Sequence, residues 1–119
     1  PAQTTCVASE RSHRKSGRAA ERANLDDIIN NELAEDSAKT AASEKKMKLI
    51  ANMETERVLE GLIMGKGFED AIVSMTDANI NIVVKHESIK IEDAAQIYNL
   101  VVQQTTYTAS QIILTPYSA

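Results

Sequence analysis

Two histidines and one cysteine are the residues of this sequence that most often bind metals or act as nucleophiles. His13, His86 and Cys6 lie in different segments, and their spacing matches no ligand pattern of a structural zinc site. His86 is followed by Glu87, which could orient it as a general base. The pair falls at the expected end of a strand, where an exposed pair without a catalytic role is the favoured interpretation. We therefore expect no metal and no cofactor.

Two further motifs resemble functional sites: a pair of adjacent carboxylates and a lysine between two glycines. Glu69-Asp70 could act as a carboxylate pair, but polar residues at the entry to a strand are the favoured interpretation. Gly65-Lys66-Gly67 superficially resembles a phosphate-binding loop, yet it follows a predicted helix, so no helix N-terminus would face a phosphate there. The sequence thus offers no catalytic constellation, and we expect that the protein is not an enzyme.

Charge is distributed unevenly along the 119 residues. Residues 1–57 carry ten basic and ten acidic side chains, whereas residues 58–119 carry three and seven, which accounts for the net charge of −4. Phosphate-backbone binding requires clustered Lys and Arg, so the acidic second half argues against nucleic acid as a partner. The basic run of Arg11, Arg14, Lys15 and Arg18 is interpreted as a solvated helix face. A small nucleic-acid-binding αβ domain remains the alternative, and it would predict salt-dependent retention of RNA or DNA.

The element that organises the second half is a predicted β-hairpin. Residues 70–76 and 80–86 are rich in β-branched side chains and flank the polar turn Asp77-Ala78-Asn79. The second run alternates between apolar and polar positions, which is typical of a half-buried strand. A two-stranded hairpin is marginally stable alone, so helices must cover its apolar face.

Three helices and one more strand are expected around this hairpin. The patterns predict helices over residues 10–31, 38–66 and 91–104, and a strand over 112–115 that Pro116 closes. The second helix should bury a face that includes Met47, Ile50 and Met53, with a possible break near residues 52–55. Gly67 fits the left-handed position after a helix, with Phe68 contacting Ile63. Lys90 is a poor N-cap for the third helix, and Ser88 could replace it.

These elements predict an α+β fold in which residues 1–36 form an N-terminal helical arm and connector, and residues 37–119 form the compact domain. The compact order is αββαβ. We place the first strand in the middle of a three-stranded sheet, in the order 2-1-3, with two helices on one face. Ala71, Val73 and Met75 should point toward those helices. The opposite face is half apolar, and both edges of the sheet are expected to be exposed.

Such a sheet is suited to binding other proteins by strand addition or by packing across its face. The hairpin segment 80–86 and the end of the second helix, 58–66, are the predicted contact segments. The candidate partner-binding residues are Ile72, Ser74, Ile80, Ile82, Val83, Val84, His86, Val58, Leu62 and Lys66.

Two stretches of the sequence resemble a known family. They are residues 59–73, Leu-Glu-Gly-Leu-Ile-Met-Gly-Lys-Gly-Phe-Glu-Asp-Ala-Ile-Val, and residues 80–85, Ile-Asn-Ile-Val-Val-Lys. The combination of Gly-aromatic-Glu-Asp-Ala with an Ile-Asn-Ile strand is similar to the stage III sporulation protein AH family of endospore-forming bacteria. The resemblance covers residues 21–116, and Lys90 departs from the small polar cap expected at its position.

That resemblance implies a ring-building-motif domain, similar to those of secretion-system ring proteins, and no enzymatic activity. It implies a single-pass protein of the mother-cell membrane around the engulfed forespore, with its soluble domain in the intermembrane space. The implied partner is stage II sporulation protein Q, and copies would form a channel-like homo-oligomeric ring. Because the sequence begins with Pro1 and contains no apolar run of about 18 residues, we expect the membrane anchor to lie in an N-terminal segment missing from it.

Overall fold

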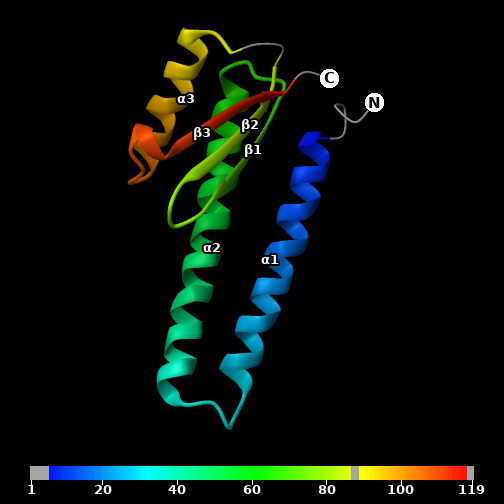
Figure 1. Ribbon diagram of the computed structural model, residues 1–119, viewed down its shortest axis with the longest axis vertical. Helices are drawn as coiled ribbons and strands as arrows, with labels where there is room; N and C mark the ends of the chain where they lie inside the picture. The colour runs from blue at the N-terminus through cyan, green and yellow to red at the C-terminus, as the bar shows by residue number, and fades with distance from the viewer. Residues whose placement is uncertain (1–5, 87–88, 118–119) are drawn as a thin grey trace.

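The computed structural model describes residues 6–86 and 89–117. Two long helices lie side by side as a hairpin, and a small αβ layer is built on the end of the second helix (Figure 1). The elements in chain order are α1 (Cys6–Asn30), α2 (Asp36–Gly65), β1 (Asp70–Met75), β2 (Ile80–Lys85), α3 (Ile91–Gln104), a 3₁₀ turn η2 (Ala109–Gln111) and β3 (Ile112–Tyr117). The predicted α+β class and αββαβ order are confirmed, with α1 as the preceding helix.

The sheet has the strand order β1-β2-β3, so the predicted order 2-1-3 is wrong. The hairpin strands β1 and β2 are antiparallel, and β3 returns after α3 to pair with β2 in parallel. The first strand cannot take the central place because side chains of α1 and α2 occupy its outer edge, as described below. The free side of β2 is therefore the one that β3 joins.

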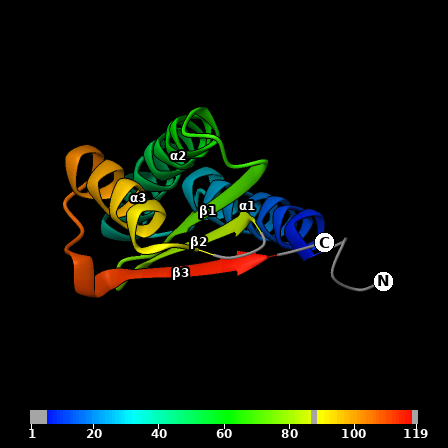
Figure 2. The same ribbon diagram turned by 90° about the horizontal axis from the view of Figure 1, so that it is seen from above.

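The main core lies between this sheet and the helices α2 and α3, which cover the same face (Figure 2). The strand positions that face the helices include Ala71 and Val73, which pair across the sheet with Val84 and Ile82. Leu59 and Ile63 of α2 meet them, as do Ile97 and Val101 of α3. The predicted inward positions of β1 are thus confirmed, and Met75 packs against this core from its border.

The exit from α2 follows the predicted geometry. Gly67 has φ = +107°, a conformation that side chains bearing a Cβ rarely adopt. The backbone N–H groups of Lys66 and Gly67 donate to the carbonyl oxygens of Ile63 and Met64, each at 3.0 Å. Phe68 then turns into the core beside Ile63, which fixes the direction in which the chain enters β1.

The buried face of α2 differs from the prediction. Met47 is 72% exposed, and Ile50 and Met53 are also largely exposed, although their spacing predicted a core face. The helix shows no break near residues 52–55. The residues that are buried include a row spaced every seven positions, Ala42, Leu49, Glu56 and Ile63, together with Leu59 and Glu60. Two of the six, Glu56 and Glu60, carry carboxylates.

Two element ends also differ in detail. The third strand continues through Pro116 to Tyr117, because β3 is an edge strand, where a missing N–H is tolerated. The N-cap of α3 is Lys90, whose backbone N–H donates to the Asp93 carboxylate at 3.2 Å. Asp93 therefore supplies the capping contact that the lysine side chain cannot, and the alternative cap Ser88 lies outside the described residues.

Candidate interaction surfaces

One face of α1 points toward the rest of the protein, and its central positions are arginines. Val7 and Leu25 are buried near the two ends of this face. Between them Arg11, Arg14 and Arg18 follow at helical spacing and are half-buried. The prediction of a solvated basic face is therefore wrong for these three side chains. It holds for Lys15 alone, which is exposed.

The arginines lie along the outer edge of β1. One helical turn rises about 5.4 Å, and two strand residues advance about 6.6 Å, so side chains one turn apart meet alternate peptide groups. Each arginine donates to one outward-facing carbonyl. The three contacts are Arg11 to the oxygen of Ala71 at 3.1 Å, Arg14 to that of Val73, and Arg18 to that of Met75 at 3.3 Å.

Two glutamates of α2 accept hydrogen bonds from the N–H groups of the same edge. Glu60 Oε2 accepts from Val73 N–H at 2.8 Å, and Glu56 Oε2 accepts from Met75 N–H at 2.7 Å. With Arg11, Arg14 and Arg18 they form what we call the edge clasp. The clasp satisfies both the donors and the acceptors of a strand edge that an incoming strand would otherwise use.

Ion pairs hold the clasp together across the two helices. Arg18 pairs with Glu56 at 2.7 Å, and Arg14 pairs with Glu60 at 2.5 Å. Burial raises the pKa of Glu56, and the Met75 N–H and the two nearby arginines offset part of that rise. No buried side-chain nitrogen or oxygen in the described residues lacks a hydrogen-bond partner. The buried charges are thus compensated, as buried ions must be.

The clasp ends at Asp70, which Arg11 contacts at 3.0 Å. Partial burial acts to raise the pKa of Asp70, but hydrogen bonds from Arg11 and the Ala71 N–H outweigh it and lower that pKa. The same hydrogen bond raises the pKa of Arg11. Glu69 pairs instead with Lys85, at 3.1 Å. The two adjacent carboxylates therefore serve separate ion pairs.

The opposite border of the sheet is open. In the described part of the chain β3 pairs on one side only, with β2. Its outer-face positions Ile113 and Thr115 are exposed, and so is Pro116 near its end. The expectation of two exposed edges is therefore corrected to one, because the clasp occupies the β1 edge.

The ten predicted contact residues fall into three groups. Ile72, Ile80, Ile82 and Val84 are buried within the chain and cannot reach a partner while it is folded. Half-buried positions are Ser74, Val83 and His86. The exposed positions are Val58 and Leu62 on α2, and Lys66 directly after it. The predicted contact segment 80–86 is the central strand β2, whose backbone is paired on both sides. A partner could therefore contact this strand only through its side chains and not by pairing with its backbone.

His86 has a structural environment. Its Nε2 lies 3.7 Å from an Asp93 carboxylate oxygen, and its ring meets the edge of Phe68 with centroids 5.2 Å apart. These contacts join the end of β2 to α3 and to the exit of α2. The neighbouring Glu87 lies outside the described residues.

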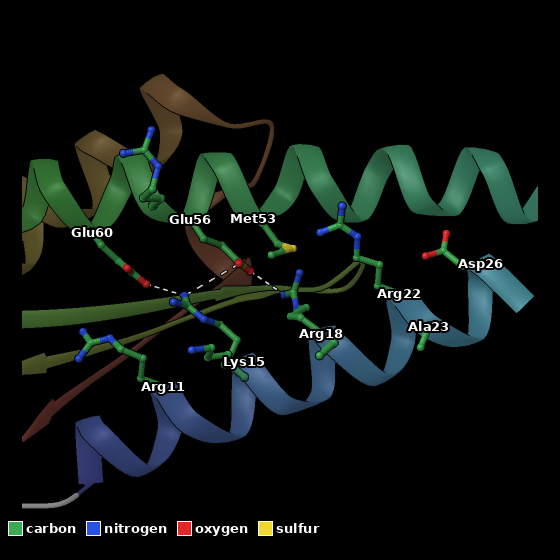
Figure 3. Close-up of a pocket in the computed structure, with 12 residues that line it drawn as sticks. Arg11, Lys15, Arg18, Arg22, Ala23, Asp26, Met53, Glu56 and Glu60 are labelled. Carbon is green, nitrogen blue, oxygen red and sulfur yellow. Dashed lines mark hydrogen bonds and ion pairs between the residues drawn. The ribbon is translucent and has the colours of Figure 1, made fainter.

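A cleft of about 580 Å³ opens between α1 and α2, next to the edge clasp (Figure 3). Its floor includes Ala19, Ala23 and Met53, and charged side chains surround it. The charged lining residues are Arg11, Arg14, Lys15, Arg18, Arg22, Arg57, Asp26, Glu56 and Glu60. This cleft is not among the sites predicted from the sequence. The sequence feature that indicates it is the spacing of Arg11, Arg14 and Arg18. These residues fall on the same face of the helix as the buried Val7 and Leu25.

Two features of the described residues concern metal binding and membrane insertion. No group of three or more His, Cys, Asp or Glu side chains is arranged to hold a metal ion. Among the described helices, none has both the length and the apolar character needed to cross a bilayer.

Comparison with known proteins places these surfaces in context. The sequence model of a family described as SpoIIIAH-like protein matches residues 2–114. Stage III sporulation protein AH of Bacillus subtilis (strain 168) is 34% identical over 87 residues, which are 73% of this chain and 40% of that protein. A chain in a solved structure of the SpoIIQ-SpoIIIAH pore forming complex superposes with a TM-score of 0.86 and 28% identity, over 95% of this chain and 97% of that one. The chain spans less than half the length of the curated relative.

Proposed function

The chain belongs to the SpoIIIAH-like protein family, and from that membership we propose that it is a structural component of a sporulation channel. It binds a SpoIIQ-type protein and has no catalytic role. The observation that carries the proposal is the superposition on a SpoIIQ-SpoIIIAH complex over 95% of this chain. The arrangement of α1, the clasp and the sheet supports it, because a rigid domain with one free strand edge can present a defined docking border.

The proposed setting is the space between the two membranes that surround the forespore. The protein is anchored as a single-pass protein in the mother-cell membrane, through a segment that precedes the residues studied. Its domain meets the SpoIIQ-type partner, which projects from the forespore side. Several copies assemble into a ring around the channel. Support for this setting comes from the family and from the named complex.

The contact surface that the geometry favours is the open border of the sheet. An incoming strand would pair with β3, while Val83 and Ile113 of the outer face would pack against the partner. These two side chains lie on the same face as the half-buried Ser74. The exposed α2 residues Val58 and Leu62 lie on a separate surface that this contact leaves free.

Direct binding to the partner tests this proposal. Isothermal titration would measure the affinity of the 119-residue chain for the soluble domain of the SpoIIQ-type protein from the same organism. The variant Ile113→Lys places a charge at the open border and should weaken binding by more than about tenfold, since an unpaired charge at an interface centre is costly.

A matched control is Val102→Lys on α3, because Val102 and Ile113 are 44% and 46% exposed. Val102→Lys should bind like the unmodified chain. If the unmodified chain does not bind the partner, the proposed function is wrong. If both lysine variants bind normally, the partner uses a surface other than the β3 border.

A further inference from the structure

The cleft between α1 and α2 has cations that this chain does not neutralise. Each carboxylate that lines it is already paired, since Asp26 contacts Lys46, Glu56 contacts Arg18 and Glu60 contacts Arg14. Lys15 and Arg22 also line the cleft, and neither has an ion pair or side-chain hydrogen bond among the described residues. Figure 3 shows Arg22 extending from α1 toward α2, whereas the side chain of Lys15 stays close to α1. The cleft therefore favours an acidic occupant.

The occupant must also cover an apolar floor. Ala19, Ala23 and Met53 line the cleft between its charged sides, and all three are exposed. A volume of about 580 Å³ lies within the range of about 300–1,000 Å³ that is typical of ligand pockets. A large apolar side chain flanked by carboxylates would match both the floor and the cations.

This chain carries such a segment at the connection between α1 and α2. Leu33 is 94% exposed, and Glu32 and Glu35 beside it are exposed as well. Residues 26–36 contain five acidic side chains and no basic one. The turn is defined, because Leu33 N–H donates to Asn31 Oδ1 at 2.9 Å and Ala34 N–H donates to the Asn31 carbonyl at 3.1 Å. We call residues 31–36 the acidic tip.

The acidic tip of a given copy cannot enter its own cleft. It lies at the far end of the helical hairpin, where α1 ends and α2 begins (Figure 1). The cleft lies further along the same two helices, next to β1. An occupant with the chemistry of the tip must therefore come from another molecule.

We propose that the acidic tip of one copy docks into the α1–α2 cleft of a second copy, with Leu33 on the apolar floor and Glu32 and Glu35 facing Lys15 and Arg22. This inference rests on the proposed function, since it names the surfaces that join copies of the assembly. The contact uses two different surfaces, so it is heterologous, and the joined pair keeps one free cleft and one free tip. Such a contact adds copies in one direction and forms a ring if the rotation per copy closes.

Charge reversal with rescue tests this docking. Sedimentation velocity of the 119-residue chain over a concentration series should show mass that increases with concentration and falls back in about 1 M salt, where screening is strong. The cleft variant Lys15→Glu/Arg22→Glu and the tip variant Glu32→Lys/Glu35→Lys should each weaken association by more than about a hundredfold. All four positions are exposed, so circular dichroism and the thermal midpoint should remain those of the unmodified chain.

The decisive sample is an equimolar mixture of the two variants. The reversed tip then faces a reversed cleft, and the native tip faces a native cleft, so association should return. A control, Glu44→Lys/Glu92→Lys, changes the net charge as much as the tip variant does but at exposed positions outside both surfaces. It should associate like the unmodified chain.

Three outcomes of the self-association experiments overturn the inference. They are an unmodified chain that stays monomeric at every concentration, association that either reversed pair leaves unchanged, and a mixture that remains monomeric. Titration of the same variants with the SpoIIQ-type domain separates this inference from the proposed function. Partner binding by a chain that does not self-associate removes the docking and leaves the proposed function. Loss of partner binding in the cleft variant alone assigns the cleft to that partner, which also overturns the docking between copies.

Discussion

The edge clasp predicts that Glu56→Ala is among the most destabilising single substitutions in this protein. Glu56 is only 2% exposed. Its carboxylate accepts from Arg18 and from the Met75 N–H, both at 2.7 Å. Alanine removes the carboxylate that accepts both bonds. The Met75 N–H is left without its acceptor, and the largely buried Arg18 guanidinium keeps only its 3.3 Å contact with the Met75 carbonyl oxygen.

The expected loss is about 3–5 kcal/mol, the usual cost of removing one member of a buried ion pair. Two hydrogen bonds that involve a charge give a similar figure, since each contributes about 1.5–3 kcal/mol. A domain of this size has a total stability of about 5–15 kcal/mol, so a large share would be lost. At about 4 °C per kcal/mol, the thermal midpoint should fall by about 12–20 °C.

Urea unfolding followed by circular dichroism would measure this loss, and an unchanged slope would show that the unfolded state is the same. Glu54→Ala is the matched control, because Glu54 lies two residues earlier on the same helix in an exposed pair with Arg57. Its unfolding midpoint should equal that of the unmodified chain within error.

A second variant separates loss of the ion pair from loss of the edge contact. In Arg18→Met/Glu56→Leu the pair is replaced by apolar side chains, which is often close to neutral. The Met75 N–H loses its acceptor, at a cost of about 1–3 kcal/mol, and the Met75 carbonyl oxygen loses its 3.3 Å contact with Arg18. No charge is left buried without its counter-ion, so this variant should be more stable than Glu56→Ala. The reasoning is refuted if Glu56→Ala unfolds at the same urea concentration as Glu54→Ala.

Three further substitutions test other parts of the fold. Because the pKa of Asp70 is lowered in the folded state, its contribution is present above the unfolded pKa of about 3.9 and is lost as pH falls through the lower folded value. Asp70→Asn should therefore flatten the acid limb of the stability curve, measured by urea unfolding at several pH values below about 5, and an unchanged limb would contradict the role of this ion pair. Gly67→Ala should cost about 1–2 kcal/mol in the same assay, because φ at this residue is +107°; a neutral result would show that the turn relaxes. Leu59→Ala should cost about 2–5 kcal/mol because Leu59 is fully buried, whereas the exposed Leu62→Ala should cost much less, and equal losses would contradict the assigned face of α2.

Much of the local structure could be predicted from the sequence because it depends on neighbouring residues. Alternation of side chains located β1 and β2, and the helix over residues 91–104 agrees with α3 at both ends. Gly67 marked the end of α2 because few other residues adopt its backbone conformation.

The errors arose where distant residues decide the outcome. The strand order depends on Arg14 and Arg18, which reach the β1 edge from more than 50 residues away in the sequence. The buried face of α2 was misjudged because Glu56 and Glu60 occupy core-facing positions, while Met47 and Ile50 remain exposed. Hydrophobic periodicity ranks such carboxylates as solvent-facing, and only the β1 edge explains why they point inward.

The same spacing rules could have found the candidate cleft. Residues 11, 14 and 18 continue the helical row defined by Val7 and Leu25, and residues 56 and 60 continue the row of Leu49 and Ile63. Opposite charges at inward positions of two neighbouring helices indicate an interhelical ion-pair network. What the sequence alone does not provide is the third participant, the peptide groups of β1.

The two borders of the sheet differ, and only the β3 border is free, so each molecule can pair with a single strand of another protein. A protein whose two outer strands were both free could polymerise edge to edge without limit, as in cross-β fibres. Here one border is closed by side chains of α1 and α2, and the other contains Pro116, which offers no N–H. Such a protein can thus accept one incoming strand and still remain protected from edge-to-edge polymerisation.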